Sequence, residues 1–472
     1  MVENDFDRER SIRISAGVDH TAPSAEEVPA PRARPRLEVL DGIRFLAALY
    51  VVFFHLSAGD RGSWQKPSHE LFGPLFHVAS YGWLGVELFF MISGFVICMS
   101  TWGKTFGQFA ISRVVRLYPA YWFCVLLTTA VVLIDPSIAH ALSWSQVLKN
   151  LTMTESWTQV PLVDPSYWTL AIELMFYLLV AVTLVSRGFT YARVVVFCSV
   201  WLAVSLLDGL IQSPWFSIVV QPLYAPFFIA GMVLYLIHRF GPRRLLWVLL
   251  ACTWGCAMYR LDSRTAGQHP SGATLNYWVS ATMVTAFFAV LTLIALGKLG
   301  MIRGRWLITA GTLTYPLYLV HQQIGETIIS SFDQNVPPWI LLPGVIALLL
   351  ILAWLVQRFV ERPLAGRVRA VLHGGLAIIL ASGPYGSPSP EPPKPAEPPG
   401  RGAGHAGGAI LEADERPGPG AAGCPPGISP GAVTGAADDL RPALGAHAAS
   451  GSMTLTRPWT PPRPPSRPRS RT

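Results

Sequence analysis

The sequence predicts an all-α integral membrane protein, a bundle of about ten transmembrane helices. Hydrophobic residues make up 51% of the 472 residues, charged residues only 14%, and the mean hydropathy is +0.40. A soluble domain carries about 25% charged residues. The apolar residues gather in stretches of about 20 residues, the length that a helix needs to cross the hydrocarbon core of a bilayer.

Ten such stretches follow one another before the composition changes. They cover residues 38–57, 82–102, 118–135, 166–186, 194–210, 219–238, 245–260, 276–297, 306–325 and 338–357. We therefore divide the chain into an N-terminal arm (1–36), a membrane domain (37–370) and a low-complexity tail (371–472).

The positions of Lys and Arg predict the orientation, because cytoplasmic loops retain positive charge. With the N-terminal arm inside, about 21 basic residues lie in cytoplasmic segments and about five in the opposite loops. This distribution predicts N-in and C-in, with an even number of spans. It also accounts for the net charge of +8 without a nucleic-acid partner.

The two ends of the chain differ in composition from the membrane domain. The arm is mixed in charge and leads straight into the first span, so we expect that span to act as its own signal anchor. From about Gly383 the chain is rich in Pro, Gly, Ala and Arg, which is typical of a disordered segment. An alternative is that the tail is a shifted reading frame of a GC-rich gene.

The first span carries two ionisable residues, Arg44 and His55. They are eleven residues apart, which places them on nearly the same helix face, about 16 Å apart along the axis. Charged groups inside a bilayer usually face a cavity or a partner. The alternative is that Arg44 reaches to the interface and His55 marks a helix end.

Arg113 and Arg116 are three residues apart, on one face of an expected short cytoplasmic helix before the third span. Paired guanidinium groups suit phosphate recognition, because they are planar, forked and permanently charged. The positive-inside rule explains the same two residues without a function.

Further ionisable and polar side chains fall in the predicted spans. Glu87 begins the second span, Glu173 and Tyr177 lie in the fourth, and His321 lies in the ninth. Glu173 and Tyr177 are four residues apart and can hydrogen-bond each other, a purely structural reason for both. A carboxylate inside a bilayer is nevertheless hard to explain by packing, so we favour a functional role.

Six short motifs in this order resemble the membrane acyltransferase family three, the polytopic O-acyltransferases that modify bacterial cell-surface sugars. They are DGIRFLAALYVVFFH, GVELFFMISGF, SRVVRLYPAYW, SYWTLAIELMFY, YLVH and VERP. The resemblance covers about residues 37–369. Unlike longer relatives, the chain shows no SGNH-hydrolase-like domain after the spans, which leaves open whether a separate extracytoplasmic protein completes transfer.

The resemblance implies roles at the matching positions. His55 matches the histidine regarded as essential for acyl transfer, and Arg44 the basic residue of the same motif. Arg113 and Arg116 match the arginine pair associated with the acyl-coenzyme A donor, with acetyl-CoA expected. Glu87, Glu173 and His321 lie in motif segments without a settled role. The implied acceptor is a carbohydrate of the cell envelope, and the implied location is the inner (plasma) membrane.

The chemistry agrees with this implication. A hydroxyl that attacks a thioester must lose its proton, and an imidazole, with a pKa near about 6.5, suits that work as a base or as an acyl carrier. We expect Glu173 to orient His55, provided that their spans meet. We expect no metal and no permanently bound cofactor. A polytopic transporter and a non-catalytic partner in polysaccharide export are the alternatives.

Overall fold

The computed structural model describes residues 37–381 except 60, 212, 269 and 271–272. The elements of this part are α1 (Glu38–Ser57), α2 (Ser68–Phe72), α3 (Pro74–Ala79), η1 (Gly82–Leu84), α4 (Gly85–Thr101), α5 (Phe106–Ile134), α6 (Trp144–Asn150), α7 (Glu155–Thr158), η2 (Pro165–Tyr167), α8 (Trp168–Val180), η3 (Ala181–Val185), α9 (Tyr191–Ser205), η4 (Leu206–Gly209), α10 (Pro214–Val220), α11 (Ala225–Phe240), α12 (Arg244–Ala266), α13 (Tyr277–Ala295), α14 (Arg305–Val320), α15 (Gln322–Phe332), α16 (Pro338–Val356), η6 (Gln357–Glu361) and α17 (Arg362–Ala381). The predictions for the arm and for the tail beyond residue 381 lie outside the described residues.

The prediction of an all-α membrane protein is confirmed. Among the described residues, eight helical segments are long and apolar enough to cross a membrane. They are Glu38–Ser57, Pro74–Thr101, Phe106–Ile134, Pro165–Val185, Tyr191–Gly209, Pro214–Phe240, Tyr277–Ala295 and Pro338–Gly375. Helices α12 and α14 also lie where spans were predicted, but α12 carries several charges and α14 has only 16 residues. The total of ten and the orientation stay predictions.

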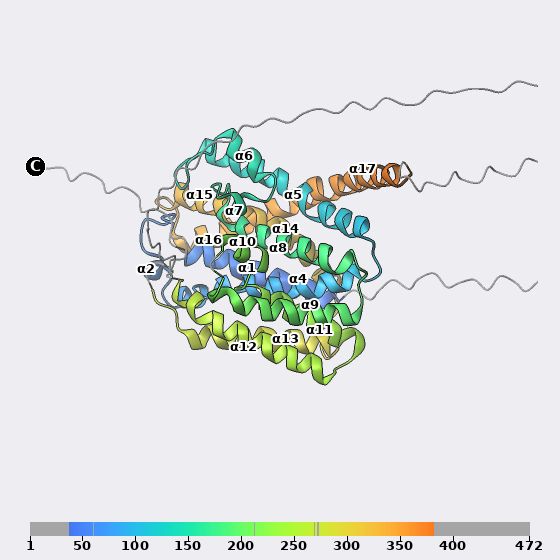
Figure 1. Cartoon of the computed structure of the whole chain (residues 1–472). Helices are drawn as coiled ribbons and strands as arrows, with labels where there is room; N and C mark the ends of the chain where they lie inside the picture. Colours follow the sequence, from blue (N-terminus) through green and yellow to red (C-terminus); the bar gives the residue numbers. More distant parts are fainter. Residues whose placement is uncertain (1–36, 60, 212, 269, 271–272, 382–472) are drawn as a thin grey trace, which may run out of the picture. The chain divides into compact units, whose positions relative to one another are not determined.

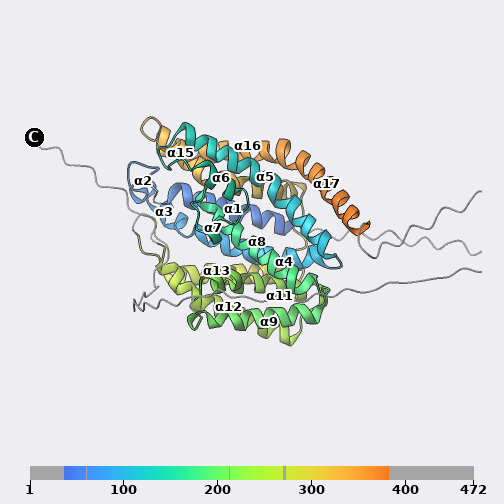
Figure 2. The same ribbon diagram turned by 45° about the horizontal axis from the view of Figure 1, so that its top comes forward.

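Helix α1 lies at the centre of the helices that position the site. It contacts α4 on one side and α14 on the other, and α14 contacts α5 and α16 in turn. Helix α4 packs along α11, which also contacts α9, α12 and α13. Figures 1 and 2 show α9, α11, α12 and α13 together on one side of α4, with α5, α15 and α17 on the opposite side of α1.

Helices α4 and α11 approach each other at two glycines. A Cβ atom at Gly94 would collide with the carbonyl oxygen of Phe228, and one at Gly231 would collide with that of Met91. Glycine at both positions therefore permits the close approach of the two helices.

One local expectation about a helix is wrong. Arg113 and Arg116 lie not on a separate short helix but on the continuous 29-residue helix α5, which runs through Pro119. Although proline usually ends a helix, Pro363 lies in the first turn of α17 directly after the π-helical turn η6, and the helical chain continues through it. Helix α17 runs to Ala381, past the expected domain boundary at residue 370.

Candidate active site

Two histidines from distant parts of the sequence meet in this fold. His55 lies in the last turn of α1, and His321 lies at the junction between α14 and α15. Nε2 of His321 is 3.1 Å from Nδ1 of His55. Nδ1 of His55 is also 3.0 Å from the carbonyl oxygen of Val51, and Nδ1 of His321 is 2.7 Å from that of Tyr318.

These contacts determine which ring nitrogen carries each proton. A carbonyl oxygen only accepts, so Nδ1 of His321 carries a hydrogen and donates it to Tyr318. In the neutral ring, Nε2 of His321 is then an acceptor, and it accepts from Nδ1–H of His55. The lone pair of His55 is consequently on Nε2. The pair therefore leaves one basic nitrogen, His55 Nε2, available for chemistry.

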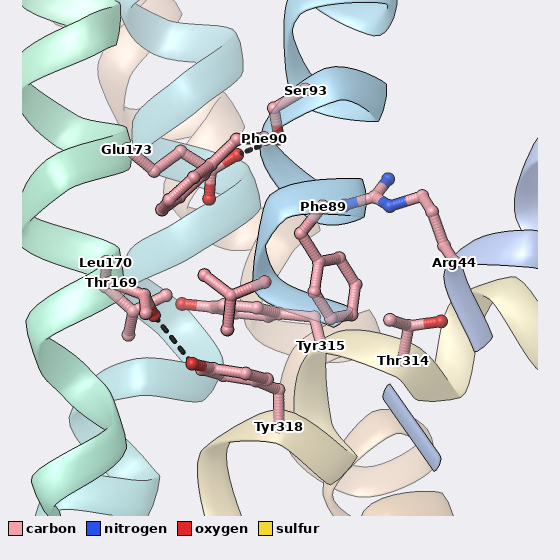
Figure 3. Close-up of a pocket in the computed structure, with 11 residues that line it drawn as sticks. Arg44, Phe89, Phe90, Ser93, Thr169, Leu170, Glu173, Thr314, Tyr315 and Tyr318 are labelled. Atoms are coloured by element: carbon pink, nitrogen blue, oxygen red, sulfur yellow. Dashed lines mark hydrogen bonds between the residues drawn. The ribbon is translucent and has the colours of Figure 1, made fainter. Parts of the chain in front are cut away.

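A small cavity of about 50 Å³, which we call the inner cavity, lies next to Tyr318, a neighbour of His321; neither histidine is part of its lining. Its lining comes from α1, α4, α8 and α14, as Figure 3 shows: Arg44, Val86, Phe89, Phe90, Ser93, Thr169, Leu170, Glu173, Thr314, Tyr315 and Tyr318. The ring of Tyr318 is 5.2 Å from the ring of His321. The inner cavity thus connects the polar group at Arg44 with the aromatic wall beside His321.

A larger cavity of about 410 Å³, the basic cavity, adjoins the inner cavity. It is lined by Arg44, Ser93, Val96, Ile97, Ser112, Arg113, Val115, Arg116, Glu173, Tyr177, Glu361, Ala365 and Arg369. The two cavities share Arg44, Ser93 and Glu173. Four guanidinium groups line the basic cavity, so an anionic ligand is favoured there.

The protein holds the two arginines of α5 in place. Nη1 of Arg116 forms an ion pair with Oε1 of Glu361 at 2.8 Å. The guanidinium of Arg113 bonds the hydroxyl of Ser100 and lies 5.5 Å from the centre of the Tyr177 ring. Glu361 ends the π-helical turn η6, a distortion that is common at functional sites. Helix α5 and η6 therefore build the basic cavity together.

A family model described as "Acyltransferase domain" matches residues 37–358. The chain belongs to this acyltransferase family. Individual relatives match over shorter segments. The acyltransferase MdmB of Streptomyces mycarofaciens is 27% identical over 150 residues, which cover 30% of this chain and 38% of that protein. The peptidoglycan O-acetyltransferase OatA of Listeria monocytogenes is 29% identical over 167 residues, which cover 31% of this chain and 24% of that protein.

The O-acetyltransferase OatA of Staphylococcus aureus is 29% identical over 174 residues, covering 33% of this chain and 25% of that protein. The matched segment thus spans less than two fifths of each of these curated relatives. No solved structure matches the chain.

In this acyltransferase, Glu173 does not take the place that we expected. Its Oε1 accepts hydrogen bonds from Ser93 at 2.7 Å and from Tyr177 at 2.5 Å, so the structural contact between Glu173 and Tyr177 is present. The hydrogen-bond partner of His55 from another helix is His321 instead. Glu173 lines both cavities, where its charge faces Arg44.

Glu87 has a structural partner. It is fully buried and forms an ion pair with Arg264 of α12, whose guanidinium lies 4.6 Å from the centre of the Tyr224 ring. This pair lines neither the inner nor the basic cavity. Glu87 therefore connects α4 to α12, and we assign it no part in the chemistry.

The acyltransferase has supporting residues that sequence reasoning missed. Buried Asp164 accepts the backbone N–H group of Gln323 at 3.0 Å, next to His321, and its charge acts on that ring. Arg61 forms an ion pair with buried Glu326 at 2.7 Å and reaches the amide of Gln323. A polar residue before Pro165 is an ordinary helix-start signal, so Asp164 did not stand out among the other residues.

No group of three or more His, Cys, Asp or Glu side chains that can hold a metal occurs in the part of the chain that the structure describes.

Proposed function

We propose that this chain is an inner-membrane O-acyltransferase that moves an acyl group, with acetyl expected, from cytosolic acyl-CoA to a hydroxyl of a cell-surface or lipid-linked sugar. One observation carries the proposal: shared lining residues connect the arginine-lined basic cavity with the inner cavity, whose Tyr318 contacts His321, the partner of His55. Relatives named as peptidoglycan O-acetyltransferase and O-acetyltransferase support acetyl as the group and a glycan as the acceptor.

The donor would bind through its charged end. Arg113 and Arg116 suit the phosphates of coenzyme A, because guanidinium groups form forked, charge-assisted hydrogen bonds with phosphate. The narrow pantetheine arm would pass Arg44, whose Nε atom is buried and has no hydrogen-bond partner within the described residues. An amide or carbonyl oxygen of the arm supplies the missing acceptor.

The transfer step uses the free nitrogen of His55. As the acceptor oxygen bonds to the thioester carbonyl carbon, Nε2 of His55 takes the hydroxyl proton. The carbon–sulfur bond then breaks, and the proton passes to the departing thiolate, which leaves as coenzyme A. In the carrier version, Nε2 attacks the thioester carbon, the carbon–sulfur bond breaks and the thiolate leaves. The acceptor oxygen then bonds to the acyl carbon, the bond from this carbon to Nε2 breaks, and the hydroxyl proton passes through Nε2 to the thiolate.

His321 supports both versions. When Nε2 of His55 is protonated or acylated, the ring becomes positively charged and Nδ1–H becomes a stronger donor. Nε2 of His321 accepts from this group, so the contact strengthens as charge develops. His321 is therefore a positioning residue, and His55 is the residue that meets the reacting atoms.

The test is transfer of labelled acetyl from acetyl-CoA into alkali-labile ester, in membranes of the native host with its own glycans. Wild type, His55→Ala and empty vector are compared at equal protein level. The matched control is His238→Ala, because His238 also lies in a span and bonds a backbone carbonyl, but its contacts are with Ala295 and Phe95 rather than with the histidine pair. Label in wild type and His238→Ala, lost in His55→Ala, supports the proposal. No label from any acyl donor favours transport or export.

The donor site has its own test. Arg113→Ala combined with Arg116→Ala raises the KM for acetyl-CoA, whereas Arg303→Ala combined with Arg305→Ala, at another predicted cytoplasmic loop, leaves it unchanged. An unchanged dependence on acetyl-CoA concentration in the first double variant contradicts the donor role.

A further inference from the structure

A second pocket, of about 330 Å³, lies on the other face of α8. We call it the aromatic pocket. Elements α7, α8, α10 and η4 and the segment before α11 build it, and its walls include Trp157, Trp168, Asp208, Ser217, Gln221 and Tyr224. It lies at the N-terminal end of α8, and Trp168 comes directly before Thr169 of the inner cavity.

Gln221 is an unusual residue in this pocket. It is 4% exposed and has a φ of +52°, a left-handed conformation that is costly for a residue other than glycine. Its Nε2 donates to the carbonyl oxygen of Ile172 at 2.9 Å, which fixes the amide. Its Oε1 is buried and has no hydrogen-bond partner within the described residues. A buried acceptor without a donor destabilises a protein. A ligand that donates a hydrogen bond to this oxygen would explain why the acceptor is present.

The other polar walls are also suited to hydroxyl groups. Oδ2 of Asp208 forms an ion pair with Arg260 at 3.2 Å, while Oδ1 has only a long contact, 3.5 Å, with the hydroxyl of Ser217. Because Arg260 neutralises the carboxylate, the pocket favours a neutral ligand that donates hydrogen bonds. Lipid tails donate none and would leave Gln221 and Asp208 unsatisfied.

We propose that the aromatic pocket binds a neutral sugar residue of the acceptor glycan, one that is not itself acylated; this rests on the proposed function. A sugar ring presents C–H groups that pack on aromatic rings such as Trp157, and hydroxyls that donate to Gln221 and Asp208. The volume is in the range of small-molecule sites.

The position of the pocket agrees with a role in acceptor binding. The ring of Trp168 is 5.6 Å from that of Tyr224, which is 5.3 Å from Phe90 in the lining of the inner cavity. One layer of aromatic side chains therefore separates the aromatic pocket from the inner cavity. A sugar bound there holds its glycan beside the reaction without occupying the donor path.

Kinetics in native-host membranes test the assignment. Trp157→Ala and Gln221→Leu each lower acetyl transfer by about tenfold at equal protein level, while the KM for acetyl-CoA stays within about twofold. Trp157→Phe restores most of the rate, because it keeps an aromatic surface. Trp215→Ala is the matched control, since Trp215 lies on α10, is 68% exposed and is not in the pocket lining. Unchanged transfer, or a loss explained by the acetyl-CoA KM, overturns the proposal.

Direct binding separates this proposal from the proposed function. Saturation-transfer NMR on the full chain in nanodiscs uses methyl glycosides of glucose, galactose, mannose, rhamnose and N-acetylglucosamine as probes, with glycerophosphoglycerol as a lipid-headgroup probe. We expect a signal from at least one glycoside in wild type that Trp157→Ala and Gln221→Leu reduce. Such a signal without acetyl transfer refutes the proposed function but keeps the sugar site. No glycoside signal, equal signals in the variants, or a pocket-dependent signal from glycerophosphoglycerol alone overturns the sugar site.

Discussion

Replacing His321 by alanine removes the acceptor that faces Nδ1 of His55. The carbonyl oxygen of Val51, 3.0 Å away, remains and keeps the proton on that nitrogen, so His55 Nε2 stays basic. What is lost is a hydrogen bond that becomes charge-assisted during the reaction, worth about 1.5–3 kcal/mol. At about 1.4 kcal/mol for each factor of ten, kcat falls by about 10- to 150-fold. Removing the base in His55→Ala costs about 10²- to 10⁴-fold.

The assay is the initial rate of labelled acetyl transfer at several acetyl-CoA concentrations, which separates kcat from KM. We expect a lower kcat and an unchanged KM in His321→Ala, and partial recovery in His321→Gln, whose amide oxygen can accept the same hydrogen. Because His321 is fully buried, thermal unfolding in detergent and the protein level in membranes serve as controls. An unchanged kcat in folded His321→Ala refutes the hydrogen-bond argument, and so does a loss equal to that of His55→Ala.

Three further predictions concern stability, each measured by thermal unfolding in detergent. Gly94→Ala destabilises the protein by at least about 1–3 kcal/mol, because the new methyl group meets the Phe228 carbonyl; equal unfolding temperatures would contradict the α4–α11 contact. Glu87→Gln leaves the buried Arg264 unpaired and destabilises the protein by about 3–5 kcal/mol, whereas Glu87→Leu combined with Arg264→Met destabilises it less. A single variant that is less destabilised than the double variant would refute the pairing. Burial raises the pKa of Glu155, outside the spans, from 4.5 to about 7, so its contribution to stability is complete below about pH 4.5 and is lost as pH rises through about 7. Glu155→Gln should flatten this dependence, and an unaltered pH profile would speak against it.

Much of the fold was predictable because a bilayer imposes a simple rule on sequence. Apolar stretches of about 20 residues must be helices, since backbone groups in lipid need partners within the same segment. Helices α1, α4, α5, α8, α9, α11, α13 and α16 all lie where an apolar stretch predicted a span. The continuation through Pro363 was not predictable from the rule that proline stops helices, because the preceding π-helical turn changes which backbone groups need partners.

The sequence predicted which residues could belong to the candidate site, but not which of these residues contact one another. An intramembrane ionisable residue stands out in any sequence, and this singled out Arg44, His55, Glu173 and His321. Which of them meet depends on how the helices pack, and no feature of the sequence distinguishes a Glu173–His55 contact from the His321–His55 contact that the structure has. The buried Oε1 atom of Gln221, which has no donor within the described residues, was likewise not predictable, because glutamine is an ordinary residue at a helix end.

The narrowness of the inner cavity has a consequence for the energy balance of the cell. A path between two aqueous compartments would normally dissipate the proton gradient of a membrane. The inner cavity, through which we propose that the donor reaches His55, holds only about 50 Å³, and Arg44 lies in its wall. A fixed guanidinium in a constriction repels hydrated protons and other cations, as it does in water-selective pores. We therefore expect a membrane that contains this protein to hold its electrical potential while the proposed acyl transfer takes place.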